Sequence, residues 1–584
     1  MSRADGSETV RAQIDARAAE HGERLFLIAP NDDDNDDGDD DNDGDGDGDG
    51  ETITFAQLKA SADDIGARLD RLRAKPRAKV AFLLDNGAWI VRLFLSIMAS
   101  GRVAVPLNAV AGPTQLRHVL DHSDAELAFV STRHRAKLDE LLARIDRDIA
   151  VIEVCERRGP RWPDSIESIT SIDSSVPPPS SADAALLLYT SGSTGLPKGA
   201  LLSHRAVVCG GRNVAGGHAL TASDRALCVL PVYHINGAMV TVAAPLCSGG
   251  SVVMPRRFSA NAFWRLAATY RCTWSSVVPT IIKYLLDRAE REPFRFGEDA
   301  RLRHFRFGRS ASAPLPTVVL RQWEAVFRVP MIETLGLTET AGTVATNPMP
   351  PATRKVGSVG RAHGDAIRII ALSANDDGDG DGNNDDGDDD DSNNDDDDSN
   401  NDDDDGNNGD DDGNNGDGGA DCAVDVVGEI VVRGDNLLDE YYKDAAATRA
   451  AFARGWFRTG DLGRLDRDGY LFVTGRLKEL IIRGGENIAP REIDDALYRH
   501  EAVLEAAAVG VKHPDYGQEV VACVALREGF DCDEPTLRSF CLDAVGAAKA
   551  PKRIYFMQSL PKGPSGKILR LELPRLIESL RERD

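Results

Sequence analysis

The sequence lacks the patterns that hold structural metals or disulfides. Its nine cysteines are scattered and none forms a C-x-x-C pair, so neither a zinc site nor a disulfide framework is predicted. No run approaches the roughly 18 apolar residues of a membrane span, and the first residues lack the unbroken apolar core of a signal peptide. These absences predict a cytoplasmic protein without a membrane span.

No stripe of lysine and arginine with interleaved aromatic residues is present either, so nucleic-acid binding is not predicted. The formal charge of −27 comes from two tracts, Asn31 to Gly50 and Asn375 to Gly418, which hold 12 and 22 aspartates. Without them the chain would carry about +7. A mildly basic folded part is compatible with a ligand that carries phosphates.

The two tracts consist almost only of Asp, Asn, Gly and Ser, which cannot bury enough apolar surface to fold. Strand-like runs flank each one: RLFLIAP and TITFAQL the first, AIRIIALSA and CAVDVVGEIVVRG the second. We therefore predict lengthened hairpin turns. Calcium binding is the alternative, but no EF-hand frame in DNDGDGDGDG has the glutamate needed at its twelfth position.

From about Val80 to Ser373, short β-branched runs alternate with helical patterns such as Trp89 to Ser100 and Ser259 to Tyr270. This alternation predicts an α/β fold with mainly parallel sheets. A β-rich patch follows, predicted to resemble a distorted barrel. A smaller α+β unit then begins, with a helix near Glu534 to Gly546. The predicted domains are residues 1–475 and 476–584, joined by a hinge.

The stretch YTSGSTGLPKG, Tyr189 to Gly199, follows an apolar run suited to a buried strand. Small residues allow close approach of a ligand, and successive N–H groups in such a turn form an anion-binding nest. It is not the G-x-x-x-x-G-K-[ST] nucleotide loop, because Pro197 occupies the position of the second glycine. The stretch predicts a phosphate site of another kind.

Five sequence motifs in order resemble those of the adenylate-forming family, which includes acyl-CoA synthetases, adenylation domains and luciferases. They are YTSGSTGLPKG, LGLTET (Leu335 to Thr340), GWFRTGD (Gly455 to Asp461), GRLKELIIRGGENIAPREID (Gly475 to Asp494) and PKGPSGKILR (Pro561 to Arg570). The resemblance covers some 500 residues. It implies that a carboxylate attacks the α-phosphate of Mg-ATP, giving an acyl-adenylate and pyrophosphate, and that the thiol of coenzyme A then displaces AMP.

The resemblance also implies the nucleotide site. ATP and AMP would contact Thr190, Ser191, Gly192, Ser193, Thr194, Gly195, Lys198, Ser312, Ala313, Pro314, Leu335, Gly336, Asp461 and Arg476. Asp461 would accept from both ribose hydroxyls. The family usually has an aromatic residue where this chain has Leu335, and offset stacking on adenine is worth about 0.5–1.5 kcal/mol. ATP binding should therefore be modestly weaker.

Thr338 matches the family's phosphate-binding threonine, and Glu339 the Mg²⁺-binding glutamate. Read without the family, Thr-Glu also fits the start of a helix. Lys567 matches the catalytic lysine that bridges the substrate carboxylate and the α-phosphate. Lys478 lies at the hinge. Rotation there would bring Gly484, Gly485, Glu486 and Asn487 to line a channel for coenzyme A.

His234 occupies the family's aromatic gate between acyl pocket and thiol channel; a satisfied core histidine is the alternative. His234, Asn236, Arg309 and Ser310 would line the acyl pocket, which is more polar than a long alkyl chain needs. Arg309 could pair with a second anionic group, so a short polar or anionic carboxylic acid is predicted. The resemblance extends to synthetases of oxalate and carnitine.

Several alternatives stay open at this point. The enzyme could load an acyl carrier protein instead of coenzyme A, or activate medium- or long-chain fatty acids. A non-catalytic scaffold would retain the fold without the chemistry. A monomer or a homodimer is expected, and the sequence does not choose between them.

Overall fold

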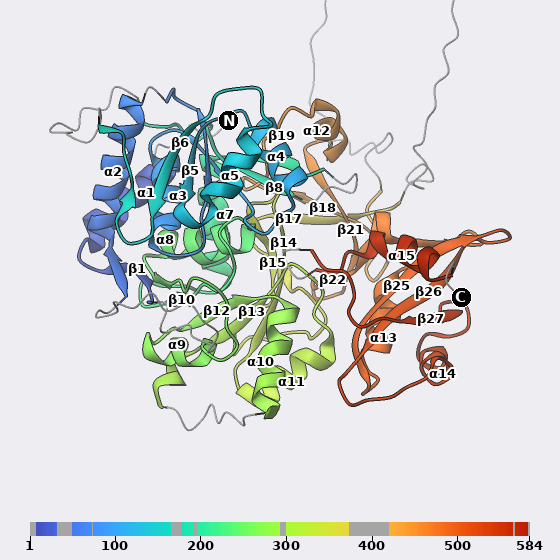
Figure 1. Cartoon of the computed structure of the whole chain (residues 1–584). Coiled ribbons are helices and arrows are strands. Elements are labelled where there is room, and N and C mark those ends of the chain that lie inside the picture. Colours follow the sequence, from blue (N-terminus) through green and yellow to red (C-terminus); the bar gives the residue numbers. More distant parts are fainter. Residues whose placement is uncertain are drawn as a thin grey trace, which may run out of the picture.

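The computed structural model describes residues 8–31, 50–72, 74–164, 177–190, 196–291, 300–372, 420–563 and 567–581. Figure 1 shows a large lobe, blue to orange, and a small lobe, orange to red, at its side. The large lobe contains three β-sheets and the small lobe a fourth. The predicted α/β class is confirmed, and the domain limits 1–475 and 476–584 stay a prediction.

Two sheets of the large lobe have parallel centres and antiparallel edges. The first runs in the order β16 (Arg361–Ala362), β15 (Gly342–Thr346), β14 (Met331–Leu337), β13 (Phe307–Ser310), β12 (Trp274–Val277), β10 (Arg225–Leu227), β11 (Ser251–Val253), β1 (Leu25–Ala29) and β2 (Glu51–Thr54). The second runs β19 (Glu440–Tyr441), β9 (Lys198–Ser203), β8 (Ala184–Thr190), β4 (Val103–Pro106), β3 (Lys79–Leu83), β5 (Ala125–Ser131), β6 (Ala150–Cys155) and β7 (Gly159–Pro160).

The helices of the large lobe cover these sheets. They are α1 (Val10–His21), α2 (Phe55–Arg71), α3 (Ala88–Ala99), α4 (Pro113–His122), α5 (Arg135–Leu142), α7 (His204–Gly217), the π-helix η4 (Asn236–Ala243), α8 (Ala244–Ser248), α9 (Phe263–Thr269), α10 (Pro279–Arg291), α11 (Thr317–Phe327) and α12 (Ala445–Ala451). Helix α3 is buried along almost its whole length and belongs to the largest hydrophobic core. Burial of most of its surface fits its predominantly apolar sequence, which Arg92 and Ser96 interrupt.

The third sheet is antiparallel and matches the predicted β-rich patch. It contains β17 (Ala366–Ile370), β18 (Gly428–Arg433), β20 (Phe452–Ala453), β21 (Trp456–Leu465) and β22 (Leu471–Arg476). Strand β22 pairs with β21 at one side of this sheet. It is the last strand before the short 3₁₀ turn η6 (Leu477–Glu479) that leads to the small lobe.

The small lobe packs three helices on its own sheet. The strands are β23 (Ile481–Arg483), β24 (Glu486–Ile488), β25 (Val503–His513), β26 (Gly517–Leu526) and β27 (Arg553–Phe556), and the helices α13 (Pro490–Leu497), α14 (Glu534–Val545) and α15 (Leu573–Arg581). Strands β25 and β26 form a long antiparallel hairpin. Ile493 and Leu497 of α13 and Leu537 of α14 cover one face of it.

Both predicted hairpins are confirmed at their strands: β1 pairs antiparallel with β2, and β17 with β18. Most of each acidic tract, residues 32–49 and 373–419, lies outside the described residues. The prediction of a strand over all of TITFAQL is wrong beyond Thr54. There the Thr54 hydroxyl accepts from the Gln57 N–H and the Gln57 side chain accepts from the Thr54 N–H, a capping box that starts α2.

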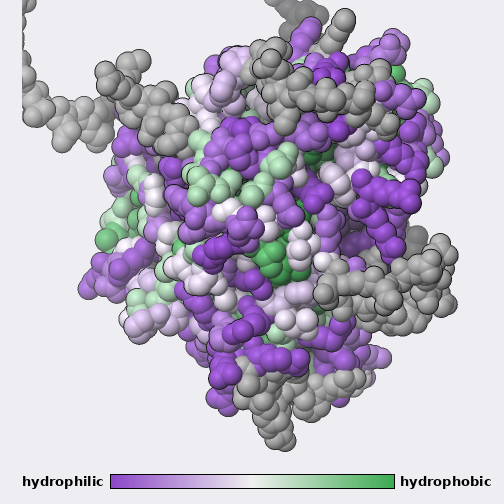
Figure 2. Space-filling model, turned by 90° about the vertical axis from the view of Figure 1, so that its left-hand side faces the viewer, coloured by the Kyte–Doolittle hydropathy of each residue, from purple (hydrophilic) through white to green (hydrophobic). Residues whose placement is uncertain are grey.

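The helix expected from Trp89 is α3 and the one expected from Glu534 is α14. The helix expected from Ser259 begins only at Phe263. Hydrophilic side chains cover most of the face in Figure 2, with smaller hydrophobic groups between them. Within the described ranges, no helix is long and apolar enough to cross a membrane.

Candidate active site

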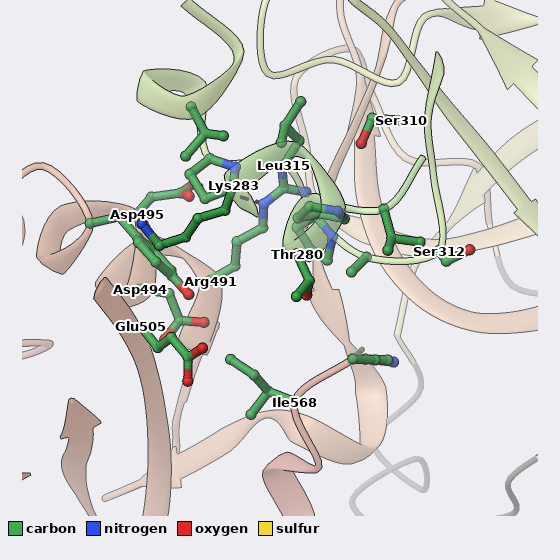
Figure 3. Close-up of a pocket in the computed structure, with 18 of the residues that line it drawn as sticks. Thr280, Lys283, Ser310, Ser312, Leu315, Arg491, Asp494, Asp495, Glu505 and Ile568 are labelled. Atoms are coloured by element: carbon green, nitrogen blue, oxygen red, sulfur yellow. Dashed lines mark ion pairs between the residues drawn. The ribbon is translucent and has the colours of Figure 1, made fainter. Parts of the chain in front are cut away.

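A cavity of about 490 Å³ lies between the two lobes. Figure 3 shows Thr280 and Lys283 of α10 and Ser310 of β13 on one side, and Arg491, Asp494 and Ile568 of the small lobe on the other. Its wall also contains the predicted catalytic Lys567 and the predicted nucleotide residues Ser312, Ala313, Pro314, Leu335, Gly336, Asp461 and Arg476. Residues far apart in the chain therefore meet at one crevice.

The hydroxyl-rich turn joins β8 to β9, which pair antiparallel with Thr190 opposite Lys198. This register places both ends of the turn side by side. The Lys198 ammonium lies 3.4 Å from the Asp444 carboxylate and above the ring of Tyr441. The predicted contacts Ser191, Gly192, Ser193, Thr194 and Gly195 lie outside the described residues.

Thr338 and Glu339 lie in the turn between β14 and β15, so the helix-cap alternative is wrong. Leu337 pairs with Gly342, which leaves a four-residue connection. A Cβ at Gly336 would lie 2.0 Å from the Gly342 carbonyl oxygen, so only glycine fits this approach of the two strands. The LGLTET segment therefore forms part of a tight hairpin and does not start a helix.

Side chains outside the predicted motifs support this turn. Asn436 donates from its amide to the Thr340 carbonyl at 2.8 Å, and the Leu438 N–H donates to the Glu339 carbonyl at 2.7 Å. The Tyr441 hydroxyl donates to Glu339 Oε1 at 3.0 Å. These contacts fix the Glu339 carboxylate, which acts electrostatically on Arg476 but is not among the residues that line the crevice.

Asp461 and Arg476 face each other on β21 and β22, where their Cα atoms are register partners. Arg476 Nε lies 2.7 Å from Asp461 Oδ1, and 6% of the Asp461 side chain is exposed. Burial raises the pKa of Asp461, against the opposing effect of Arg476. Asp461 lies within strand β21.

Lys567 of the small lobe reaches the same crevice. Burial lowers the pKa of its ammonium, and the nearby Arg476 adds to this effect while Glu479 and Asp461 oppose it. Within the described part of the chain, no acidic oxygen lies within ion-pair distance of this ammonium. The lysine thus approaches the Asp461–Arg476 pair with its charge unmatched.

Arg309 lies on β13 and is 1% exposed. Its guanidinium donates to Asn236 Oδ1 at 3.2 Å, Ser276 Oγ at 2.9 Å and Thr343 Oγ1 at 2.9 Å. Its Nε has no hydrogen-bond partner, and no carboxylate pairs with it among the described residues. Burial lowers the pKa of Arg309 to about 9, so it is a buried cation at neutral pH.

The polar groups around Arg309 form one connected cluster. Ser276 Oγ donates to Asn236 Oδ1 at 2.7 Å, and the Asn236 amide donates to Ser312 Oγ at 3.4 Å. Ser312 lies on the wall of the crevice. The cluster therefore links the buried arginine to the crevice through two side chains, and the neighbouring Ser310 Oγ is buried without a partner.

His234 precedes η4, and its ring lies 4.9 Å from that of Tyr233. Its Nε2 is buried and has no hydrogen-bond partner in the part of the chain that the structure describes. Burial lowers the pKa of His234 to about 4, so the imidazole is neutral at pH 7. The alternative of a satisfied core histidine does not fit a ring nitrogen without a partner.

The predicted channel residues are not part of this crevice. Gly484 and Gly485 form the two-residue turn between β23 and β24 with φ of 59° and 85°, as a type I′ hairpin requires. Residues 484–487 are exposed, and so is Lys478 in η6. Reaching the crevice would require the small lobe to turn, as the hinge prediction states.

The sequence analysis missed several residues of the site. Tyr441 and Ser276 contact predicted residues, Asn436 contacts the turn that carries Glu339, and Arg491 lines the crevice. The only available signal was the Ser275–Ser276 pair inside an apolar strand run, because polar residues in a buried strand need partners. Within the described residues, no group of three or more His, Cys, Asp or Glu could hold a metal on its own.

Two family models match the chain. The model described as AMP-binding enzyme matches residues 14–381, and the model described as AMP-binding enzyme C-terminal domain matches residues 492–567. The first match alone covers more than half of the chain. The second lies within the small lobe and ends at Lys567.

Two curated relatives align over most of their length. A sulfoacetate–CoA ligase of Cupriavidus necator is 41% identical over 97% of this chain and 97% of that protein. An oxalate–CoA ligase of Arabidopsis thaliana is 32% identical over 85% of this chain and 88% of its own. Among solved structures, ATP-bound MatB from Rhodopseudomonas palustris superposes with a TM-score of 0.79 at 24% identity, over 98% and 99% of the two chains, which shows a shared fold.

Proposed function

The chain belongs to the AMP-binding enzyme family, and on that premise we propose that it is an ATP-dependent acid–thiol ligase whose acid is short and carries a second anionic group. The carboxylate oxygen attacks the α-phosphorus of ATP, the bond to the β-phosphate oxygen breaks, and pyrophosphate leaves. The thiol of coenzyme A, losing its proton, then attacks the acyl carbon and AMP leaves. One carbon–sulfur bond is formed for each ATP converted to AMP.

The residues around the crevice suit the first of these steps. Asp461 offers carboxylate oxygens to the ribose hydroxyls, and Arg476 holds that carboxylate in place. Lys567 places its unmatched ammonium between the carboxylate of the acid and the α-phosphate, where negative charge increases in the transition state. Thr190, Thr338 and Lys198 surround the phosphates with hydroxyl donors and one further cation.

Glu339 is suited to hold Mg²⁺. Its Oε1 accepts from Tyr441, and within the described residues its Oε2 has no partner. Mg²⁺ in such sites usually takes one or two carboxylates with phosphate oxygens and waters, which fits a site without a preformed cluster of acids. When bound, Mg²⁺ would neutralise charge on the phosphates.

The observation that carries the choice of acid is the buried Arg309 without an acidic partner. A charge removed from water is costly unless a counter-charge compensates it. Three neutral hydrogen bonds compensate part of this cost, and an anionic group of the substrate would supply the rest. A guanidinium suits planar carboxylates and tripodal sulfonates alike.

The names of the relatives support the same class of acid. Sulfoacetate carries a sulfonate beside its carboxylate, and oxalate carries a second carboxylate. Placing an alkyl chain against Asn236, Ser276 and Arg309 would be costly, because these polar groups would be covered without new partners. We therefore favour a two- or three-carbon acid with a sulfonate or carboxylate over a fatty acid.

His234 is proposed as the gate between acid and thiol, and residues 484–487 as the channel for the pantetheine arm after the small lobe turns about Lys478. Coenzyme A is the acceptor, as the relatives' names support. A carrier-protein acceptor, a cytoplasmic location and a monomeric or homodimeric state remain predictions from the sequence.

ATP–pyrophosphate exchange with a panel of acids tests the substrate class. We expect exchange with sulfoacetate, oxalate or malonate and much less with acetate, butyrate or decanoate. Replacing Arg309 with methionine should lower kcat/KM for the anionic acids by about 10²-fold or more, because a buried charge pair is lost. In this variant kcat/KM for butyrate, whose alkyl chain is uncharged, should rise relative to kcat/KM for the anionic acids.

Arg309→Lys, which keeps the charge, should retain more of the activity than Arg309→Met. Arg321→Met is the matched control, because Arg321 is exposed on α11 and should leave the preference unchanged. Thermal melting checks that the variants fold. The proposal would be contradicted if exchange occurred only with fatty acids of about ten or more carbons. It would also be contradicted if a folded Arg309→Met protein kept the wild-type preference among the acids.

Lys567→Ala tests the role of the small lobe in the first half-reaction. We expect acyl-adenylate formation to fall by about 10²- to 10³-fold, as for the loss of one aligned donor to a transition-state oxygen. Conversion of a supplied acyl-adenylate to the thioester should stay near the wild-type rate, because the proposed role of the lysine is confined to the first half-reaction. Separate assays of the two half-reactions measure this, and equal losses in both would refute the role.

The lowered pKa of Lys567 predicts an alkaline limit to the first half-reaction. The protonated ammonium is the active form, so kcat/KM for adenylation should be full below its pKa and fall as pH rises through it. Since burial lowers that pKa from the ordinary 10.5, the fall should begin at lower pH than for an exposed lysine. The Lys567→Arg variant stays protonated over this range, so its adenylation rate should not show the alkaline fall. The thioester step of the wild-type protein should not show it either.

A further inference from the structure

Arg491 makes a contact between the lobes that the proposed chemistry does not use. It is the second residue of α13 in the small lobe, and 13% of its side chain is exposed. Its guanidinium donates to the Val473 carbonyl of β22 in the large lobe. Its Nε also lies 3.7 Å from Asp495, one turn further along α13. Figure 3 shows Arg491 pointing into the crevice beside Asp494 and Asp495.

The acceptor of this contact lies at an irregularity in β22. Leu462 pairs with Gly475, and Gly463 pairs with Val473, so Thr474 has no register partner on β21. Such a bulge locally interrupts the ladder and redirects the strand. Arg491 therefore holds β22 at the bulge, three residues before Arg476 and its pair with Asp461.

A buried acid of the large lobe lies near the same guanidinium. Glu333 on β14 is 4% exposed and accepts from the Gly357 N–H at 3.1 Å. Burial raises the pKa of Glu333 to about 7, and Arg491 acts in the opposite direction. Glu333 directly precedes Thr334, Leu335 and Gly336 on the crevice wall. Arg491 thus interacts with two elements that build the nucleotide site.

Other charged side chains that face each other across the crevice contribute little to holding the two lobes in the arrangement described here. Arg291 of α10 and Glu528 of the small lobe lie 4.0 Å apart with both side chains largely exposed, so water and salt weaken their attraction. Burial lowers the pKa of Lys283, and Arg527 of the small lobe acts in the same direction, as a like charge would. The Arg491 contact is the better shielded of these.

We propose that Arg491 is a positioning residue: by holding Val473 it keeps the small lobe in the pose that presents Lys567 to Asp461 and Arg476. Its release would free the lobe to turn for the thioester step. The inference rests on the proposed two-step function and adds a side chain that favours one of the two poses. A charged donor to a neutral carbonyl is strong enough to bias the pose and weak enough to break in each cycle.

Arg491→Met tests this proposal with the two half-reactions assayed separately. Adenylation should fall by about 10- to 100-fold, because small misplacements of a reacting group are costly. The thioester step from supplied acyl-adenylate should stay at or above the wild-type rate. Arg491→Lys, which keeps a charged donor, should recover part of the adenylation rate. Equal losses in both steps, or no loss in either, would overturn the proposal.

Hydrogen exchange of the whole protein gives a readout that does not depend on turnover. Amides of residues 471–476 should exchange faster in Arg491→Met than in the wild type and stay close to wild type in Arg491→Lys. Arg499→Met is the matched control, because Arg499 is exposed just beyond α13 and should change neither exchange nor rates. Unchanged exchange in Arg491→Met would count against the contact.

The two proposals can fail separately. If the wild-type protein activated none of the acids, the proposed function would fall, while faster exchange at β22 in Arg491→Met would still support the contact. If the wild-type protein were active and Arg491→Met matched it in both half-reactions, the positioning role alone would fall.

Discussion

The structure depends on one electrostatic arrangement, in which a lysine of the small lobe faces an aspartate–arginine pair of the large lobe. Asp461 is held by Arg476 across β21 and β22, and Lys567 is brought near both. The Lys567 ammonium has no ion-pair partner among the described residues, and Glu479 is a further acid that acts on it from nearby. We propose that the α-phosphate of ATP supplies this partner, because opposite charges interact more strongly where water is excluded.

A second cation without an acidic partner among the described residues, Arg309, is proposed to select the acid. It is distinct from the residues proposed to carry out the chemistry. Arg309 is held by neutral groups on β12, η4 and β15, away from the residues that would handle phosphate. Changing its surroundings could alter the acid without disturbing Lys567 or Asp461. The proposed separation would let one fold take different acids, and the related proteins are named for sulfoacetate and for oxalate.

The connection between the lobes is short and has few strong contacts. Strand β22 ends at Arg476, η6 follows, and β23 begins at Ile481. A side chain that holds β22, such as Arg491, therefore acts close to the pivot and to the nucleotide site together. The exposed hairpin of residues 484–487 lies on the same lobe as Lys567, so one rotation would withdraw the lysine and present the hairpin.

The sequence by itself determined the α/β class, the hairpin strands around both acidic tracts and the identity of Lys567, Asp461 and Glu339 as candidates, because local spacing and residue type encode turns, strands and motifs. It extended the strand after the first acidic tract beyond Thr54, where α2 starts, and left Thr338–Glu339 open between helix and turn. Only the tertiary structure decided that Arg309 has no acidic partner among the described residues, that Tyr441 holds Glu339 and that Arg491 reaches Val473. These contacts join residues distant in the chain, and their partners are set by how sheets and lobes pack, which no local pattern specifies.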